Sequence, residues 1–329
     1  MCRHGTGRIT LDKRMPLRQK DIKISLYDWR TPMTTLSRTV HEIARKEGFR
    51  VSLEVFPART EKGRDGLCRL VRRLAPFRPE FVSVTYGAGG SSRDATLETI
   101  EALLEASDIP VAGHLTCAAA SRDETLAVAE RYVDMGVRRI VALRGDPQEG
   151  EEVFRPHPEG FANATELTAA LRDCWPDIAI SVAAYPEQHP ESPSREADIA
   201  NLKAKFDVGA DDALTQFFFD NDDFRRFVED ARVAGVSGPI IPGIMLTPNF
   251  YRVKNFAAKC RASVPDWLEA RFAGEEPEED VHALLAGAYA MEQVLDLAAG
   301  GVRRFHLFTM NRPQQAEAVC RALGMAEKA

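Results

Sequence analysis

The sequence predicts an α/β protein, a closed (β/α)8 TIM barrel with an extra N-terminal helix. Short apolar runs recur along the chain, and helix-like segments separate them. Most of these runs end in a polar side chain. The alternation is typical of parallel strands joined by helices, and such barrels carry their chemistry at the carboxyl ends of the strands. Strands are expected at residues 51–56, 81–86, 111–116, 139–143, 178–185, 213–218, 240–245 and 302–308.

Helices are expected before and between these strands, and several carry end signals. Ser121 and Glu124 form an S-x-x-E capping box, Gly235 suits the position after a helix, and Pro313 suits a first helical turn. The helices are predicted at residues 34–46, 66–74, 93–105, 121–135, 165–174, 194–206, 220–234, 249–261, 281–298 and 313–323, with an acidic loop at 274–280.

The first 30 residues differ from the rest, because they are basic, weakly periodic and without the apolar stretch of a secretory signal. We expect residues 1–30 to be a disordered extension, with a start at Met15 or Met33, or an organelle transit peptide, as alternatives. Residues 31–329 are expected to form a single catalytic barrel, since α/β barrels often exceed the usual domain length.

Composition excludes several classes of protein. The net charge of −6 disfavours a nucleic-acid partner, and no apolar stretch reaches the roughly 20 residues that span a bilayer. Six cysteines without a CxxC pair indicate reduced thiols in the cytoplasm, and no metal site is expected. The histidines are dispersed, which disfavours a metal-dependent hydrolase. No lysine stands at a strand end, which disfavours a Schiff-base aldolase. No GxGxxG turn follows a strand, which disfavours a Rossmann domain.

Glu54 is the strongest single candidate for chemistry. It shares a strand face with Ser52 near the expected lumen. Desolvation raises the pKa of a carboxyl group, so we expect a neutral general acid near pH 7. The alternative is a buried glutamate that pairs with an arginine for stability.

Polar residues at other strand ends complete the expected site. Arg144, Gly145 and Asp146 follow the fourth strand, where glycine lets a ligand approach the backbone; a rim salt bridge is the alternative. His114 either orients a ligand or is a satisfied core histidine, and position alone favours the second. Gln216 can both donate and accept, which suits a planar heterocycle such as a pterin or an isoalloxazine.

Other candidates depend more on context. Asp198 and Lys205 lie two turns apart on one helix face, and spacing alone favours a solvated surface for them. Tyr185 and His189 flank a proline-containing loop after the fifth strand. Cys117 follows the third strand, and we expect it to be a small buried side chain.

Motifs at many strand ends occur in an order that matches one known family. They are LEVFP at 53–57, FVSVTYGA at 81–88, HLTC at 114–117, ALRGD at 142–146, SVAAYPE at 181–187 with HP at 189–190, TQFFFD at 215–220, IPGI at 241–244 and NR at 311–312. On these residues the chain closely resembles the bacterial, single-domain methylenetetrahydrofolate reductases. The resemblance runs from residue 51 to residue 323, essentially the whole barrel.

This resemblance implies an FAD-dependent enzyme that reduces 5,10-methylenetetrahydrofolate to 5-methyltetrahydrofolate with NADH or NADPH, in two half-reactions at one site. The flavin supplies the redox chemistry, and the protein supplies orientation and charge. The resemblance places the protein in cytoplasmic one-carbon metabolism and methionine biosynthesis. The expected partners are the folate and further copies of the same chain, with no nucleic acid and no membrane.

Carried onto matching positions, the resemblance implies three catalytic residues. Glu54 is the general acid that opens the imidazolidine ring to the reactive iminium, Asp146 stabilises that cation, and Gln216 hydrogen-bonds the folate. The substrate contacts are Gln216, Arg252, Phe256 and Arg312. The flavin contacts are Thr85, Tyr86, His114, Arg144, Gly145, Asp146, Asn163, Ala164, Ala183, Tyr185, His189, Asp198, Asn201 and Lys205.

Three positions depart from the family pattern. Asn163-Ala164 replaces a Tyr-Ala pair, Ala204 replaces an arginine that contacts phosphate, and Arg252 replaces a glutamine that contacts folate. Loss of an Arg–phosphate contact weakens FAD retention, because such charge-assisted bonds are strong. The competing hypotheses are a methyltetrahydrofolate oxidase, a reductase with another electron donor, a flavin-free pterin-binding methyltransferase, and a non-catalytic subunit that has lost FAD affinity.

Overall fold

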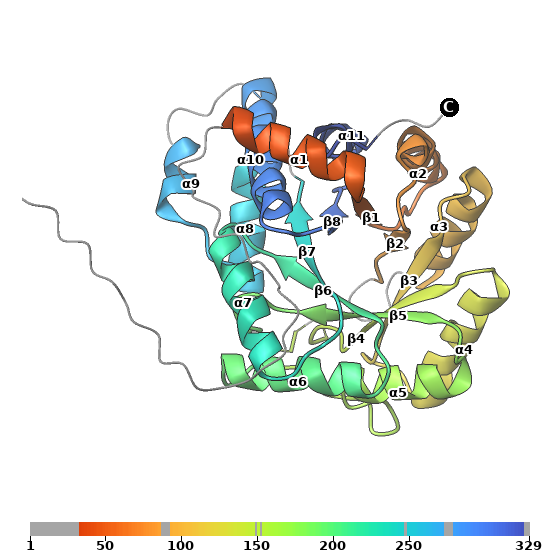
Figure 1. Ribbon diagram of the computed structural model, residues 1–329. Helices are drawn as coiled ribbons and strands as arrows, with labels where there is room; N and C mark the ends of the chain where they lie inside the picture. The colour runs from red at the N-terminus through yellow and green to blue at the C-terminus, as the bar shows by residue number, and fades with distance from the viewer. Residues whose placement is uncertain are drawn as a thin grey trace, which may run out of the picture.

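The computed structural model describes residues 33–86, 93–148, 150–151, 153–246, 249–272 and 279–325. Parallel strands close into a barrel in chain order, with β1 paired to β8, so the predicted (β/α)8 fold is confirmed (Figure 1). The strands are β1 Arg50–Val55, β2 Val82–Val84, β3 Val111–Thr116, β4 Arg139–Leu143, β5 Ala179–Ala184, β6 Asp212–Phe217, β7 Ile240–Met245 and β8 Arg304–Phe308.

Helices alternate with the strands and surround the barrel (Figure 1). The extra N-terminal helix is confirmed as α1, which packs against α10, whereas the extension predicted at residues 1–30 lies outside the described residues. The helices are α1 Met33–Lys46, α2 Glu61–Leu74, α3 Arg93–Ala106, α4 Arg122–Asp134, α5 Ala164–Cys174, α6 Arg195–Asp207, α7 Asn221–Val233, α8 Phe250–Cys260, α9 Asp266–Arg271, α10 Glu279–Ala299 and α11 Pro313–Ala322, with a 3-10 turn at Ala75–Phe77.

Local capping chemistry sets where several helices begin. The predicted capping box is present at α4, where Ser121 Oγ accepts from the Glu124 amide at 3.2 Å and Glu124 Oε2 accepts from the Ser121 amide at 2.9 Å. Helix α2 begins at Glu61, ahead of the predicted residue 66, because Thr60 Oγ1 accepts from the amide of Gly63 at 3.1 Å. The short helix α9 lies where no element was predicted.

The apolar core of the described residues has three clusters. The largest lies between the strands and the helices and includes the fully buried Leu53, Val182 and Leu307. A second cluster packs α8, α9 and α10 against the ends of β6 and β7. The smallest fills the lumen with side chains from β3, β4, β6 and β7 and the residue before β2: Phe81, Ala112, Val141, Leu214 and Ile241.

A buried ionic layer closes the amino end of the lumen. Asp212 is 2% exposed and accepts from Arg139 Nη1 at 3.1 Å and from Arg304 Nη2 at 2.9 Å. Ser181 Oγ donates to the same carboxylate at 2.6 Å. Polar side chains of the lumen that could meet a ligand therefore lie at the opposite, carboxyl end of the strands.

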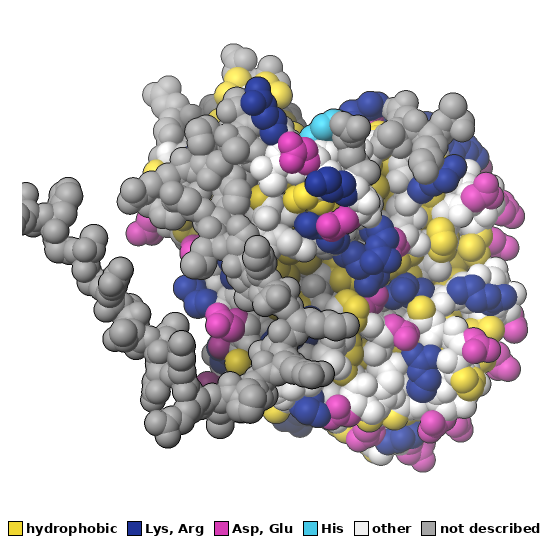
Figure 2. Space-filling view, viewed as in Figure 1, with side chains coloured by type: hydrophobic (Ala, Val, Ile, Leu, Met, Phe, Trp, Pro, Cys, Tyr) yellow, Lys and Arg dark blue, Asp and Glu magenta, His cyan; other side chains and the backbone are white. Residues whose placement is uncertain are grey.

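The described surface carries charges of both signs. On the face in Figure 2, basic and acidic side chains are intermixed. Among the helices of the described ranges, none combines the length and the apolar character of a membrane span.

Candidate active site

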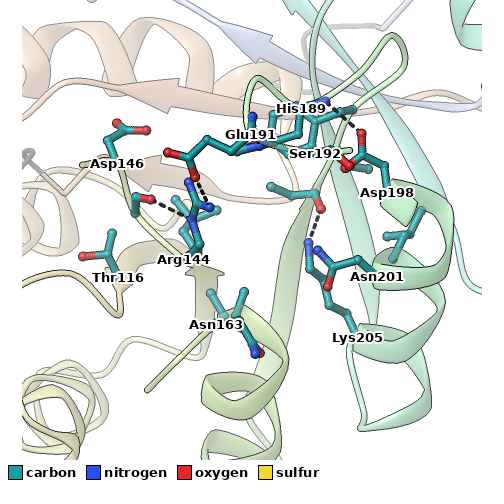
Figure 3. Close-up of a pocket in the computed structure, with 18 of the residues that line it drawn as sticks. Thr116, Arg144, Asp146, Asn163, His189, Glu191, Ser192, Asp198, Asn201 and Lys205 are labelled. Atoms are coloured by element: carbon teal, nitrogen blue, oxygen red, sulfur yellow. Dashed lines mark hydrogen bonds and ion pairs between the residues drawn. The ribbon is translucent and has the colours of Figure 1, made fainter. Parts of the chain in front are cut away.

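A cavity of about 350 Å³ lies at the carboxyl ends of the strands, between the segments that follow β4 and β5 and the first turns of α5 and α6 (Figure 3). Most of the predicted flavin contacts line it: Tyr86, Arg144, Gly145, Asp146, Asn163, Ala164, Ala183, Tyr185, His189, Asp198, Asn201 and Lys205. Three polar residues that were not predicted also line it: Thr116, Glu191 and Ser192.

Gly145 shapes one wall of this cavity. Its φ of +91° is a left-handed conformation that favours glycine. A Cβ at this position would lie 3.0 Å from Ala118 Cβ and 3.1 Å from Thr116 Cβ. The backbone of Gly145, which carries no side chain, therefore forms part of the cavity wall. Arg144 and Asp146 flank it in the sequence.

Helix α6 turns one polar face into the cavity. Asp198 Oδ2 accepts from the amide of His189 at 2.8 Å, and Lys205 Nζ donates to the carbonyl of Ala183 at 2.9 Å. Lys205 is only 6% exposed, and burial lowers its pKa to about 8 while the nearby Asp198 raises it. The solvated surface that spacing alone favoured for Asp198 and Lys205 is therefore wrong.

Asn163 lines the cavity and also caps the start of α5. Its Oδ1 accepts from the amide of Glu166 at 3.0 Å, so this side chain is the N-cap of α5. Asn163, which the resemblance predicts to replace a tyrosine, thus has a local structural role and still lines the cavity.

Contacts with Glu191 and Phe154 hold the side chain of Arg144 in place. Its guanidinium forms an ion pair with Glu191 and lies 4.7 Å from the ring centroid of Phe154. The rim salt bridge that was an alternative for this residue is therefore present, and its partner comes from the segment after β5.

Glu54 lies deeper in the lumen, at the end of a polar chain. Its Oε2 is 3.3 Å from Nε2 of His306, and Nδ1 of that ring is 2.8 Å from Ser52 Oγ. The same carboxylate oxygen is 3.3 Å from Nε2 of His114. Barrel closure creates this group, because β1 and β8 pair with Ser52 opposite His306.

The pKa of Glu54 runs against the sequence prediction. Burial raises it, but the charges and hydrogen bonds of His114 and His306 outweigh burial and lower it to about 2. The expectation of a raised pKa is therefore wrong for this arrangement, because imidazoles from β3 and β8 face the carboxylate. The alternative of an arginine partner is also wrong, since the partners of Glu54 are these two histidines.

His114 connects this deep group to the cavity. It points into the lumen from β3, as does Thr116 two residues later, and Thr116 lines the cavity. His114 is 6% exposed, and its Nε2 lies 3.3 Å from Glu54 Oε2. It does not line the cavity and is a buried histidine paired with Glu54.

Gln216 and Phe256 each contact Phe217. Gln216 Oε1 accepts from the amide of Phe217 at 3.0 Å, next to a register shift between β6 and β7. Phe256 stacks on Phe217 with ring centroids 5.6 Å apart and remains 44% exposed. The exposed ring of Phe256 on α8 and the half-buried amide of Gln216 on β6 thus both lie next to Phe217.

Other predicted residues lie away from the cavity wall. The carbonyl of Thr85 accepts from Thr96 Oγ1 at 3.1 Å. Arg312 is exposed at the residue before α11. The side chain of Arg252 lies outside the described residues.

Cys117 is inert, as expected. It is fully buried, and burial raises the pKa of its thiol to about 12. Within the described ranges, no cluster of three or more histidine, cysteine, aspartate or glutamate side chains could hold a metal ion.

Sequence reasoning missed His306 and Glu191. The alternation of β8 turns His306 inward, so strand periodicity could have identified it. Glu191 lies in an irregular loop between β5 and α6, where no periodicity predicts direction.

The chain matches the family model described as methylenetetrahydrofolate reductase over residues 39–324. It is 41% identical over 275 residues to the 5,10-methylenetetrahydrofolate reductase of Salmonella typhimurium, covering 84% of this chain and 90% of that protein. It is 40% identical over 276 residues to the enzyme of the same name from Pectobacterium carotovorum, with the same coverage of both chains.

A solved structure supports the fold. It is an uncharacterized protein from Clostridium thermocellum that binds two copies of 5-methyl-5,6,7,8-tetrahydrofolic acid, and the TM-score is 0.56. The match covers 86% of this chain and 96% of that one at 15% identity. At this identity the likeness concerns the barrel alone.

Proposed function

The chain belongs to the methylenetetrahydrofolate reductase family, and from this premise we propose that it reduces 5,10-methylenetetrahydrofolate to 5-methyltetrahydrofolate, with FAD as the cofactor and NADH or NADPH as the electron donor. The observation that carries the proposal is the alternation of β3: His114 faces Glu54 at 3.3 Å, and Thr116, on the same strand face, lines a cavity that also contains Arg144 and Lys205.

The cavity suits a flavin dinucleotide. Arg144 and Lys205 offer positive charge for phosphates, and the bare backbone at Gly145 permits close approach. Asp198 and Asn201 line the same cavity and can bond hydroxyl groups. When bound, FAD would supply hydride transfer between the nicotinamide and the folate.

His114 and Thr116 point from the same face of β3, and Thr116 lines the cavity. Because Nε2 of His114 lies 3.3 Å from Glu54 Oε2, His114 would hold the carboxylate of Glu54 in position. Asp146, at the rim, would place negative charge near the folate and favour a cationic iminium.

The proton for ring opening belongs to the histidine–carboxylate chain rather than to Glu54 alone. With a pKa of about 2, Glu54 is ionised at neutral pH. His306 lies between Glu54 and Ser52, so it can hold a proton and pass it to the carboxylate. Transfer to the folate nitrogen then leaves Glu54 ionised and His306 neutral, and solvent returns the proton to His306 before the next turnover.

Gln216 and Phe256 would orient the folate. The amide can pair with a pterin edge, and the exposed ring offers a surface for stacking. Because nicotinamide and folate would use one site, the two substrates act in turn, which gives ping-pong kinetics.

The test is the spectrum of the purified protein under anaerobic conditions. We expect flavin absorbance that NADH or NADPH bleaches and methylenetetrahydrofolate restores, with formation of 5-methyltetrahydrofolate. A protein that neither carries nor binds FAD, or whose reduced flavin does not respond to the folate, would contradict the proposal.

A further inference from the structure

An ion pair spans the proposed cofactor cavity. Arg144, at the end of β4, pairs with Glu191 from the segment between β5 and α6, and Figure 3 shows the two side chains meeting across the cavity. Their side chains are 27% and 22% exposed. The pair is therefore partly shielded from water, where a competing charge has a stronger effect than on the surface.

Phe154 holds both partners of this pair. Its backbone amide donates to Glu191 Oε1 at 3.0 Å, and its ring lies under the Arg144 guanidinium at 4.7 Å. Burial raises the pKa of Glu191, but this amide and Arg144 outweigh it, so the net pKa is lowered and the carboxylate stays charged. Arg144 is thus already neutralised by a group of its own chain.

With Glu191 in place, carboxylates outnumber cations among the side chains that line the cavity. The cations are Arg144 and Lys205, whereas the carboxylates are Asp146, Glu191 and Asp198. A pyrophosphate brought into this set would add negative charge to an excess of carboxylates. Displacement of one carboxylate lessens that conflict, and Glu191 is the one bound directly to a cation at the rim.

We propose that Glu191 occupies the anion position of Arg144 and competes with the phosphate groups of the cofactor, so that it sets the preference of this cavity for phosphate-bearing over phosphate-free flavins. This inference rests on the proposed function for the identity of the cofactor. Binding of FAD exchanges one ion pair for another: the Arg144–Glu191 contact opens, and a phosphate oxygen takes the place of the carboxylate.

The direct test measures binding of FAD and of riboflavin to the apoprotein by flavin fluorescence. Glu191→Gln keeps the size and the hydrogen-bonding shape of the side chain but removes its charge. We expect FAD to bind about tenfold more tightly, as one charge-assisted competitor is lost, and riboflavin affinity to change less than about twofold. Glu196→Gln, an exposed change on α6, controls for net charge and should leave both affinities unchanged.

A second arm does not require flavin binding. Inorganic pyrophosphate alone should raise the unfolding temperature of the Glu191→Gln apoprotein more than that of the wild type or of Glu196→Gln. In an Arg144→Gln background, Glu191→Gln should lose its effect on pyrophosphate binding, because the carboxylate acts through that guanidinium.

The outcomes separate the two proposals. Weaker FAD binding by Glu191→Gln, or an equal change for FAD and riboflavin, would overturn the competition and indicate that Glu191 orients Arg144. A pyrophosphate response that does not distinguish Glu191→Gln from Glu196→Gln would also overturn it. Failure of all variants to bind flavin, with the pyrophosphate response intact, would support the competition and reject the cofactor.

Discussion

At the scale of single residues, the environment of Glu54 decides its chemistry. A carboxyl group buried among apolar neighbours is a good acid near pH 7, but one that faces two imidazoles is ionised. Ser52 Oγ lies 2.8 Å from Nδ1 of His306 and fixes the orientation of that ring. We therefore assign proton donation to the group of Ser52, His306 and Glu54 as a unit.

The lowered pKa of Glu54 predicts how stability depends on pH. The stabilisation is complete above the ordinary pKa of 4.5 and is lost as the pH falls toward the folded value of about 2. The difference corresponds to roughly 3 kcal/mol of unfolding free energy. We expect urea unfolding of the wild type to show this loss between pH 4.5 and 2, and Glu54→Gln to lack it. Parallel pH profiles for the two proteins would contradict the pairing.

Substitution of Lys205 should change the stability of the fold and the affinity for FAD in opposite directions. Because burial lowers its pKa to about 8 from 10.5, its charge destabilises the fold below pH 8, and stability returns as the pH rises toward 10.5. At pH 7, Lys205→Met should raise the unfolding free energy by about 1–3 kcal/mol.

The same substitution should weaken FAD binding by at least about tenfold, because a phosphate partner is lost. Lys203→Met, on the same helix with a 41% exposed side chain, is the matched control and should change neither quantity much. Unfolding curves and fluorescence titrations measure the two effects. A Lys205→Met protein that is less stable yet retains FAD would be inconsistent with a buried phosphate contact.

At the scale of elements, sequence patterns predicted the strands and most helices because each carries a local signal. The capping box at Ser121 and Glu124 set the start of α4, and apolar alternation set the barrel strands. Helix α2 was predicted from residue 66, whereas Thr60 caps it at Glu61 and burial of Leu67 and Leu70 stabilises it in the fold. A local helix propensity does not include the stabilisation that comes from tertiary packing.

The packing between β3 and α4 supplies an element-scale prediction. A Cβ at Gly113 would lie 2.5 Å from the ring of Tyr132, which is fully buried and donates its hydroxyl to the carbonyl of His114 at 3.0 Å. Gly113→Ala should therefore reduce the unfolding free energy by about 1–3 kcal/mol or more.

Gly66→Ala is the matched control, because Gly66 lies in α2 with only Arg69 Nη2 near its Cβ position, at 3.8 Å. Here alanine should stabilise by about 0.5–1 kcal/mol, since it restores helix propensity. Thermal or urea unfolding measures both. The same sign for the two substitutions would show that the Tyr132 contact is not the determinant.

At the scale of the whole molecule, the barrel separates a structural end from a functional end. The amino end is closed by the ionic layer around Asp212, and the carboxyl end carries the cavity and Glu54. The direction of the parallel strands alone predicted that the functional residues lie at the carboxyl end of the barrel. It did not predict the pairing of Ser52 with His306, because that pairing depends on closure between the first and last strands, 254 residues apart.

The ionic layer gives a prediction at this scale. Asp212→Asn leaves Arg139 and Arg304 without full charge compensation in a buried position, which should reduce the unfolding free energy by about 3–5 kcal/mol. Asp211→Asn, whose side chain is 47% exposed and pairs with Arg172, should cost about 1 kcal/mol or less. Urea unfolding compares the two. Equal losses would mean that the layer contributes no more than a surface pair.

The central claim is that the Glu54 group protonates the folate and takes no part in the reaction with the nicotinamide. Rapid-mixing absorbance of Glu54→Gln, measured separately for the two half-reactions, tests it most directly. We predict flavin reduction by NADH or NADPH at nearly the wild-type rate, and reoxidation by methylenetetrahydrofolate slowed by about 10²–10⁴-fold, the range of a general acid. Reoxidation at the wild-type rate, or an equal loss in both half-reactions, would contradict it.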